Sequence, residues 1–418
     1  MSWQTVPLRQ LITPNNRRNR PDLPLLSVVR DKGIIKRKLD KSDNHNIIPE
    51  DLSNYKVVSE GQFVINKMKA WQGSCGVSPY YGIVSPAYFV FDLDIENSRF
   101  FNYAIRSRAY VDEFGRISKG IRVDQWDLDL GLLKYIRFHL PPRDEQDQIV
   151  RYLDWKVSQI NKLINAKRRQ IELLGEQKRV VINDAVTKGG EGWQKRRLKS
   201  IALISYGLGE PPALTPEGIP IIRATNIERG KIVSNDLIHT LPENIPVGKD
   251  VVLSEGNIIV VRSGAYSGDV GYITNEWSGA FAGYDMLLRV KLGEPRFLLY
   301  ALLSEYVLKD QWYLRRIRSA QPHLNAEDIG SSYIFFPPAE EQRSIAQHLN
   351  MQCGYIDKVI SKLIDEITLF AEYRTRLISD VVTGKLDVRS VIVPEYEAVE
   401  DFMEADGNSE DTEEMGEV

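Results

Sequence analysis

The stretch PPRDEQDQIVRYL, which begins at Pro141, returns as PPAEEQRSIAQHL, which begins at Pro337. The match continues without a gap to Thr187 and Thr383, and 16 of its 47 aligned positions are identical. Self-similarity of this length at a fixed offset is the signature of a repeated architecture. We therefore interpret the chain as an internal duplication.

The rest of each half repeats more loosely, with an offset that drifts by a residue or so. The triplet Ser-Glu-Gly at positions 59–61 returns at positions 254–256, and the glycines at 73 and 76 return at 268 and 271. Each half is thus a variable segment followed by a closely matched one, in the order A-B-A′-B′.

Both closely matched segments carry the apolar spacing of a long helix. Hydrophobic residues recur at steps of three and four, the heptad pattern of a coiled coil. The Pro-Pro pairs at 141–142 and 337–338 suit helix entrances, because a missing N–H costs little there. Lys167 is a departure from the pattern, since the second copy has Leu363 at that place. We expect the two helices to pack as an antiparallel coiled coil through a seam of Ile149, Leu153, Ile160, Ile164, Ile171, Leu174, Ile345, Leu349, Ile356, Ile360, Ile367 and Phe370.

The variable segments show mixed patterning. Short apolar runs at 61–65 and 257–261 predict strands that lead into glycine-containing loops, and helical stretches follow near 101–110 and 297–308. The predicted fold class is α+β, with two α/β-type domains separated by the two long helices in a pseudo-two-fold repeat. The expected boundaries are 1–139 and 191–335 for the globular domains, 140–190 and 336–390 for the helices, and 391–418 for an acidic, disordered tail.

Charge and composition limit the functional classes. Residues 395–418 contain eleven acidic side chains and no Lys or Arg, which leaves 54 basic against 46 acidic side chains in residues 1–394. This surplus permits binding to phosphate groups without proving it. No stretch reaches the roughly 20 apolar residues of a membrane helix and no secretory signal is present, so we expect a cytoplasmic protein. The two cysteines, Cys75 and Cys353, are predicted to be buried free thiols, with no metal site.

Motifs of several common enzyme classes are absent. The chain has no Asn-Pro-Pro-aromatic methyltransferase motif, no GxGxxG loop, no Walker A sequence and no HExxH, and no two histidines have metal-ligand spacing. We therefore expect neither catalytic residues nor a cofactor bound by this chain. Two alternatives remain open: a stand-alone DNA methyltransferase or nuclease with an unrecognised site, and a coiled-coil adaptor that binds only proteins.

Loops after the predicted strands carry residue types that contact nucleic acids. The segment NKMKAWQG at 66–73 combines two cations, an amide and an aromatic ring, and RSGAYSG at 262–268 is its counterpart. Trp71 and Tyr266 could equally fill core positions, and any single basic run is more often a solvated face. Because such runs recur in both halves, we predict a DNA-binding set of Lys67, Lys69, Trp71, Gln72, Arg116, Lys119, Arg122, Arg223, Asn226, Arg262, Ser263, Tyr266, Arg318, Gln321 and His323.

Several local motifs together carry a family resemblance. The entrances LPPxxEQ at 140–146 and FPPxxEQ at 336–342, the stretches NKMKAWQGSCGVS and GIVSPAYFVF in the first half, and SAQPHL at 319–324 resemble the specificity subunits of type I restriction-modification systems. The resemblance covers nearly everything before the acidic tail. It implies that the globular segments are target-recognition domains for a bipartite site in double-stranded DNA, and that the helices form the spacer between them.

The same resemblance implies partners that carry the chemistry. Two modification subunits would methylate adenine with S-adenosylmethionine, and restriction subunits would translocate and cleave DNA with ATP and Mg²⁺. A spacer of about 43 helical residues at ~1.5 Å each spans roughly 65 Å, enough to hold two readers about one DNA turn apart. Because the loops of the two domains differ, we expect two different half-sites.

Overall fold

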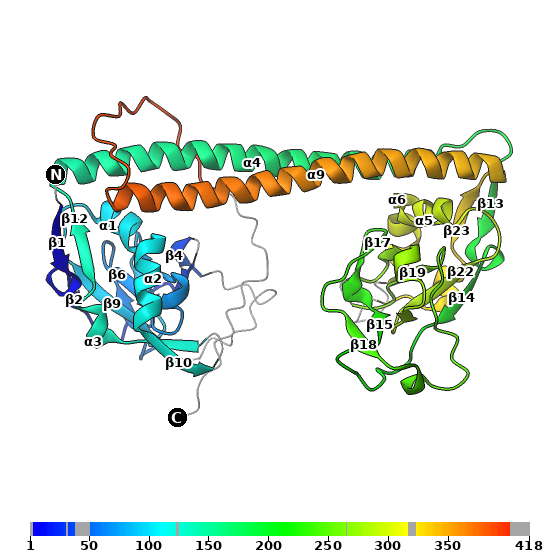
Figure 1. The fold of residues 1–418 in the computed structure, drawn as a ribbon, viewed down its shortest axis with the longest axis horizontal. Coiled ribbons are helices and arrows are strands. Elements are labelled where there is room, and N and C mark those ends of the chain that lie inside the picture. Colours follow the sequence, from blue (N-terminus) through cyan, green and yellow to red (C-terminus); the bar gives the residue numbers. More distant parts are fainter. Residues whose placement is uncertain are drawn as a thin grey trace. The chain divides into compact units, whose positions relative to one another are not determined.

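The computed structural model describes residues 3–30, 32–37, 51–122, 125–264, 266–316 and 323–401, and it contains two compact units. Unit 1 comprises residues 1–168 and 364–418, and unit 2 comprises residues 169–363 (Figure 1). Two long helices, α4 (Arg143–Thr187) and α9 (Ala339–Val382), contribute residues to both units. Each unit therefore holds one globular body and one segment of each long helix.

The body of unit 1 is built on an antiparallel sheet of four strands in the order β2-β9-β6-β7. Its inner strand β6 is buried at all four residues. The sheet and its helices are β2 (Ile12–Pro14), β6 (Phe63–Asn66), β7 (Cys75–Val77), β9 (Tyr88–Leu93), α1 (Ser98–Ile105), α2 (Arg108–Ile117) and α3 (Leu130–Leu133). Strand pairs complete the body: β1 (Gln4–Pro7) with β12 (Arg137–Leu140), β3 (Leu26–Val29) with β4 (Gly33–Lys36), β5 (Lys56–Val58) with β8 (Gly82–Val84), and β10 (Ser118–Arg122) with β11 (Gln125–Leu128).

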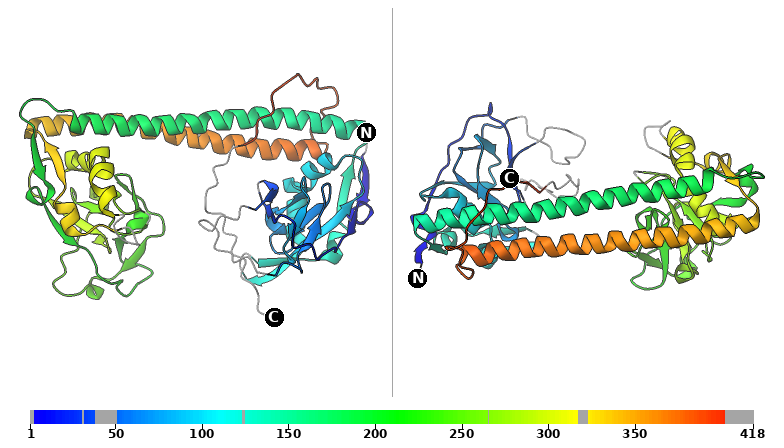
Figure 2. Two further views of the ribbon diagram at one scale, coloured as in Figure 1. Left: turned by 180° about the vertical axis from the view of Figure 1, so that it is seen from behind. Right: turned by 90° about the horizontal axis from the view of Figure 1, so that it is seen from above.

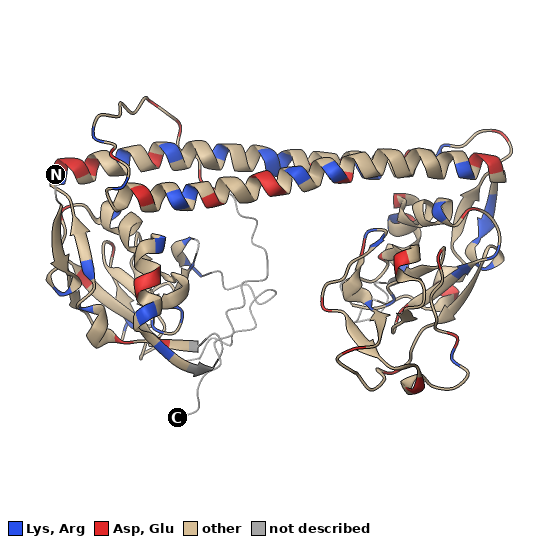
Figure 3. Cartoon of the chain, viewed as in Figure 1, with Lys and Arg blue, Asp and Glu red and all other residues tan. Residues whose placement is uncertain are grey.

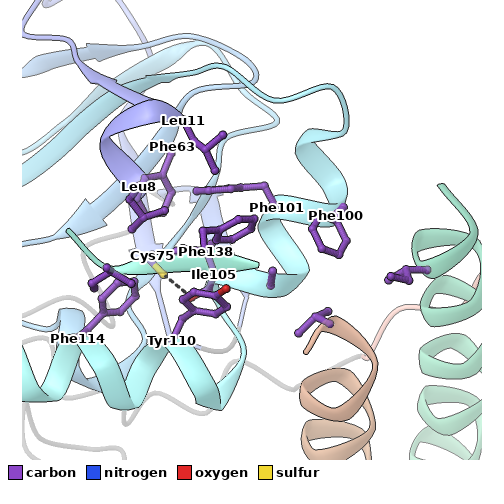
Figure 4. Packing of buried hydrophobic residues seen from close by; sticks show 14 of the residues in the cluster. Leu8, Leu11, Phe63, Cys75, Phe100, Phe101, Ile105, Tyr110, Phe114 and Phe138 are labelled. Carbon is purple, nitrogen blue, oxygen red and sulfur yellow. Dashed lines mark hydrogen bonds between the residues drawn. The ribbon is translucent and has the colours of Figure 1, made fainter. Parts of the chain in front are cut away.

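Aromatic rings from several elements form the core of unit 1 (Figure 4). Phe101 on α1 lies edge-on to Phe63 on β6, with ring centroids 5.3 Å apart, and 5.2 Å from Phe138 on β12. Such edge-to-face and tilted pairs add to the stabilisation that burial of the rings already supplies. The same core reaches α4 through Ile149 and Leu153, so the first turns of the long helix belong to the body of unit 1.

The two cysteines are buried free thiols, as the sequence predicted. Cys75 sits on β7 inside the core of unit 1, and burial raises the pKa of its thiol to about 12. Cys353 lies on α9 in unit 2. Both side chains serve as small apolar residues.

The body of unit 2 is built on a sheet of the same kind, with strands in the order β14-β22-β19-β20. Its strands are β14 (Ala202–Tyr206), β19 (Ile258–Val260), β20 (Val270–Tyr272) and β22 (Met286–Val290). A three-stranded sheet β18-β15-β21 and two strand pairs surround it, formed by β13 (Gln194–Arg197), β15 (Ile219–Ile222), β16 (Ile227–Glu228), β17 (Lys231–Ile232), β18 (Ile238–Thr240), β21 (Phe281–Ala282) and β23 (Tyr333–Phe336). The short helices are α5 (Pro295–Leu303), α6 (Glu305–Val307), α7 (Leu314–Arg316) and α8 (Ala326–Gly330).

The duplication is visible in the strand order of the two sheets. In sequence order, β2, β6, β7 and β9 take the same places in unit 1 as β14, β19, β20 and β22 take in unit 2. The loop after β6 contains Gly73 with φ +91°, and the loop after β19 contains Gly268 with φ +94°. Glycine adopts this left-handed conformation without the strain that a Cβ would cause, which explains why both copies of the loop have it.

Both long helices begin with the same contact. The Gln146 side chain is buried and donates from Nε2 to the carbonyl oxygen of Pro141, over 2.9 Å. Gln342 makes the equivalent 2.7 Å bond to the carbonyl of Pro337. The shared Pro-Pro-x-x-Glu-Gln motif thus fixes the entrance of each helix, and acidic residues in both first turns favour the positive end of the helix dipole.

Segments of α4 and α9 pack on each other within each unit (Figure 2). In unit 1, Lys167 forms an ion pair with Glu366 and lies 5.7 Å from the ring centroid of Phe370. The charge that interrupts the heptad pattern is therefore matched by an acidic residue on the facing helix. In unit 2, Lys178 pairs with Asp357 over 2.6 Å. The residues predicted for the seam are buried (Ile149, Leu153, Ile160, Ile164, Leu349, Ile356) or half-buried (Ile171, Leu174, Ile345, Ile360, Ile367, Phe370).

After α9 the chain runs back along α4 as an extended strap, Val388–Asp401. Gln148 donates to the carbonyl oxygens of Val388 and Val391 over 3.0 and 2.7 Å. Further along α4, Ser158 and Asn161 both bond to the backbone of Val399, over 2.8 and 3.0 Å. Polar side chains at intervals along one helix therefore hold the strap by its main chain.

The expectation of a disordered tail over 391–418 is wrong for its first part. The strap ends in Asp401, which forms ion pairs with Arg168 on α4 and with Arg374 on α9, the latter over 2.8 Å. Val391 and Val393 pack against the core of unit 1. Acidic composition suggested disorder, but these carboxylates and carbonyls have specific partners on the helices. Residues 402–418 lie outside the described part of the chain.

Candidate nucleic-acid interface

Three strands of unit 2 bring aromatic and basic side chains together at one edge of the sheet. Tyr206 ends β14 and is paired with Met286, which is paired in turn with Val260 of β19. Because these neighbouring strands are antiparallel, the end of β14, the start of β22 and the end of β19 meet there. Arg262 follows β19 by two residues, and Tyr284 precedes β22 by two.

The Arg262 guanidinium lies between two tyrosine rings. Its central carbon is 4.4 Å from the ring centroid of Tyr284 and 5.1 Å from that of Tyr206. A cation over the face of a ring is attracted by the ring's quadrupole, more strongly where water is partly excluded. We call Arg262, Tyr206 and Tyr284 the tyrosine clamp. It holds a planar group with hydrogen-bond donors at the surface of unit 2.

A buried carboxyl group lies under the clamp. Asp285 is only 3% exposed, and its Oδ1 accepts the backbone N–H of Arg262 over 3.1 Å. Burial raises the pKa of Asp285 to about 6, while the hydrogen bond and the charge of Arg262 act in the opposite direction. Asp285 thus anchors the backbone from which the arginine projects.

Both tyrosines of the clamp are exposed, and so is a third tyrosine in the adjoining loop. Tyr206 is 44% exposed, Tyr284 is 50% exposed, and Tyr266 in the loop after Arg262 is 59% exposed. The neighbouring Ser263 forms an isolated β-bridge with His323, and His323 is exposed. Several large aromatic groups at one surface, interleaved with a cation and polar groups, are suited to a ligand with flat rings and polar edges.

The corresponding loop of unit 1 has a different chemistry. Lys67, at the position that matches Arg262, forms a 2.7 Å ion pair with Asp127 of β11. Trp71 packs on Trp126 with ring centroids 4.9 Å apart, and Trp126 is 36% exposed. Gln72 and Trp71 form the short 3₁₀ turn of this loop and are half-buried. Unit 1 therefore presents a tryptophan pair beside a neutralised lysine.

The remaining predicted residues lie in several places. Arg116 at the end of α2 is exposed and forms an ion pair with Glu113, and Lys119 is exposed on β10. Lys69 is half-buried in the loop after β6. Arg223 donates to the carbonyl of Asp236 over 2.6 Å. Arg318 and Gln321 lie outside the described residues, as does the side chain of Arg122 on β10.

Asn226 is a correction to the predicted set. The residue is 0% exposed, its Oδ1 accepts the backbone N–H of Arg223, and its Nδ2 donates to the carbonyl of Asn235 over 2.6 Å. Both ends of the amide are thus used to hold a short 3₁₀ turn. The prediction that Asn226 contacts DNA is wrong, because a polar residue in a loop-like sequence was taken for a surface residue.

Sequence reasoning missed Tyr206, Tyr284 and Asp285. These residues are far from Arg262 along the chain, and only the antiparallel pairing of β14, β22 and β19 brings them together. A pattern search within one loop has no access to such a cluster. The available signal was the triplet Gly-Tyr-Asp at 283–285, and this triplet has no specific meaning alone.

Figure 3 shows how charge is distributed over the described chain. Lys and Arg alternate with Asp and Glu along α4 and α9, as expected for solvated faces of paired helices. Basic residues gather on β13, where Lys195 and Arg197 both lie over the ring of Tyr333, at 5.3 Å. Among the described residues, no cluster of His, Cys, Asp and Glu could hold a metal ion, and no helix could span a membrane.

Comparison with known proteins finds one kind of protein to which this chain is similar. Residues 190–369 match the family model of the type I restriction modification DNA specificity domain, a range that contains the whole tyrosine clamp. The specificity subunit of the type I restriction enzyme EcoKI, from Escherichia coli (strain K12), is 21% identical over 394 residues, which cover 86% of this chain and 82% of that protein. Over most of its length the chain is similar to the specificity subunits of type I restriction-modification systems.

Other comparisons extend over most of this chain. The putative type I restriction enzyme MjaX specificity subunit, from Methanocaldococcus jannaschii, is 26% identical over 308 residues, which cover 69% of this chain and 68% of that protein. A chain in a solved structure that concerns complex assembly and conformational transition of the type I R-M system aligns with a TM-score of 0.68 at 16% identity. The alignment covers 92% of this chain and 98% of the other, so the two share a fold.

Proposed function

We propose that this chain is the non-catalytic subunit that supplies DNA sequence specificity to a type I restriction-modification complex. The observation that carries the proposal is the match of residues 190–369 to the DNA specificity domain, within which the tyrosine clamp presents an arginine and exposed rings. Side chains of this kind read base edges by hydrogen bonds and flat contacts. Chemistry on DNA would then belong to partner subunits.

Two DNA-reading domains follow from the duplication. We assign them to residues 1–139 and 191–335, whose sheets have the same strand order but whose loops after β6 and β19 differ. Lys67, which is paired with Asp127 in the first domain, and Arg262, which lies in the tyrosine clamp of the second domain, would recognise different base pairs. The target is therefore a bipartite, asymmetric site in double-stranded DNA.

We further assign to α4 and α9 the role of an antiparallel coiled-coil spacer between the two domains. Two ion pairs support this direction: Lys167 pairs with Glu366 in unit 1, and Lys178 pairs with Asp357 in unit 2. Moving forward along α4 thus corresponds to moving backward along α9. In such a coil the helix length would set the distance between half-sites.

The partners follow from the same assignment. Two modification subunits would bind this chain and methylate adenine with S-adenosylmethionine, and restriction subunits would supply ATP- and Mg²⁺-dependent translocation and cleavage. The relatives named above are themselves specificity subunits of type I restriction enzymes. This chain would bind no cofactor of its own, and it would work in the cytoplasm, where the DNA is.

The test is to map methylated adenines genome-wide in cells that carry the modification genes, with and without this gene. The proposal predicts a bipartite methylated motif that is present only when the full chain is expressed. Methylation by the purified chain alone, with DNA and S-adenosylmethionine, would instead identify a stand-alone methyltransferase. If methylation is normal without this chain, the chain has no role in DNA recognition and is better explained as an adaptor that binds only proteins.

A further inference from the structure

Arg262 differs from other arginines of unit 2 in what its guanidinium contacts. Arg289 forms a 2.7 Å ion pair with Asp250, and Arg315 donates to the Ser331 hydroxyl over 2.7 Å. In the part of the chain that the structure describes, the buried Nε of Arg262 has no acceptor, and its guanidinium has no ion-pair partner within 4.0 Å. Two tyrosine rings are its neighbours instead.

This arrangement leaves donors unused at a half-buried position. The buried Nε is out of reach of a ligand, so the fork that a ligand can meet is formed by the two terminal NH₂ groups, which make no hydrogen bond to a described residue. The clamp already fixes the plane of the guanidinium, so a partner with two acceptors could bind without first ordering a flexible side chain. The guanidinium is therefore already oriented to donate two parallel hydrogen bonds to a ligand.

Two kinds of acceptor on DNA fit a fork, a phosphate group and the O6/N7 edge of guanine. A phosphate brings a negative charge toward Asp285, a buried carboxyl group hydrogen-bonded to the backbone of Arg262 itself. A guanine edge is neutral, planar and offers two acceptors side by side. Guanine is therefore the better partner.

The matching position of unit 1 has a lysine in place of the clamped arginine. Lys67 occupies the matching position but is an ammonium group, which cannot form the planar fork, and it is already paired with Asp127. The two domains are thus expected to differ at this point of their half-sites.

We propose that Arg262 reads one guanine in the half-site recognised by unit 2, and that Tyr206 and Tyr284 are positioning residues that hold its fork in plane. The assignment rests on the proposed function, because it names the base that this surface recognises.

The experiment uses the full chain assembled with its modification subunits. Methylation rates are measured on duplexes in which each position of the wild-type motif carries each of the four base pairs in turn. Arg262→Ala and Arg262→Lys should both lose the preference for one G·C pair, with roughly 10- to 100-fold slower methylation of the original site. All other positions, the second half-site and the spacer should keep their preferences.

Matched variants separate this role from a structural one. Arg296 also lies over a tyrosine, 4.3 Å from the ring centroid of Tyr272, but outside the clamp, so Arg296→Ala should leave the motif unchanged. Tyr284→Leu, which removes the ring over which the Arg262 guanidinium lies, should weaken the guanine preference at the same single position. Size-exclusion chromatography shows whether each variant still assembles with the modification subunits. The conservative Arg262→Lys variant gives a second control against misfolding.

Two results would overturn the inference. An unchanged motif and rate in Arg262→Lys and Arg262→Ala would make the arginine structural. Equal slowing on all sequences, with the motif intact, would make it a phosphate contact. Absence of any methylated motif with the wild-type chain is a different outcome, since it would refute the proposed function itself.

Discussion

The Tyr300 hydroxyl donates a 2.8 Å hydrogen bond to Oδ1 of Asn350, and the two residues come from the two closely spaced elements α5 and α9 of unit 2. Tyr103 on α1 makes the same bond to Asp154 on α4 in unit 1, over 2.9 Å. Burial raises the pKa of both hydroxyls, so each remains a donor at neutral pH. The duplication therefore preserved the contact that docks each globular body on a long helix.

Tyr300→Phe should destabilise unit 2 by about 1 kcal/mol, because the hydrogen bond is lost while the ring stays packed. Tyr103→Phe should destabilise unit 1 by a similar or smaller amount, since Asp154 keeps its 2.7 Å ion pair with Arg99. Urea unfolding measures both, with Tyr355→Phe, whose ring is 69% exposed, as the control. Equal stability of all three variants and the wild type would show that the docking bond contributes nothing.

The sequence predicted the parts of this architecture that depend on local repeats. The Pro-Pro-x-x-Glu-Gln motif located both helix entrances, and the structure shows why: Gln146 and Gln342 bond to the first proline of each motif. The glycines at 73 and 268 were matched in sequence and share a positive φ. Residues whose role is set by their immediate neighbours are accessible to sequence reasoning.

The tyrosine clamp and the strap were beyond that reasoning. Tyr206, Arg262 and Tyr284 meet only through strand pairing. Composition alone does not show that Ser158 and Asn161 form hydrogen bonds to the backbone of Val399, more than 200 residues away along the chain. Asn226 failed for the opposite reason, because a polar residue was given a surface role that its buried amide does not have. Tertiary pairing decides each of these cases.

Removal of the strap should loosen unit 1. A chain that ends at Ser390 loses the bonds from Ser158 and Asn161 and the ion pairs of Asp401 with Arg168 and Arg374, an expected loss of about 2–4 kcal/mol. Hydrogen exchange of peptides from residues 143–168 should rise, while peptides from 169–187 serve as an internal reference.

The matched control is a chain that ends at Asp401. This truncation removes residues 402–418 but keeps every described contact of the strap, so exchange in 143–168 should equal that of the full chain. If both truncations behave alike, the strap has no part in stabilising the helices.

Asp285 should make stability depend on pH in an unusual direction. Its pKa of about 6 lies above the ordinary value of 3.8, so the folded state holds the proton more tightly than the unfolded state. The ionised carboxyl therefore weakens unit 2 at neutral pH, and this penalty disappears as pH falls from about 6 to below 4.

Asp285→Asn keeps an acceptor for the Arg262 backbone and removes the charge. It should stabilise unit 2 at pH 7, by at most about 3 kcal/mol, and the difference from wild type should shrink toward pH 4. Urea unfolding across this range checks the trend. A gain that is constant with pH would mean that ionisation of Asp285 is not the cause.

The proposed coiled-coil spacer predicts a defined response to helix length. Insertion of seven residues after position 168 in α4 together with seven after position 363 in α9 lengthens a coil by about 10 Å, or roughly three base pairs. The methylated motif should keep both half-sites, and the unread spacer between them should become longer by about three base pairs. A single insertion in α4 alone should impair methylation, because the two helices then differ in length. An unchanged spacer length in the double insertion would refute the proposal that helix length sets the distance between the half-sites.

Whether each globular domain reads its own half-site is tested by replacing residues 191–335 with the equivalent domain of a type I specificity subunit and mapping the methylated motif in cells that carry the modification genes. One half-site should change while the other half-site and the spacer stay as they were. A change in both half-sites, or in neither, would contradict the proposal.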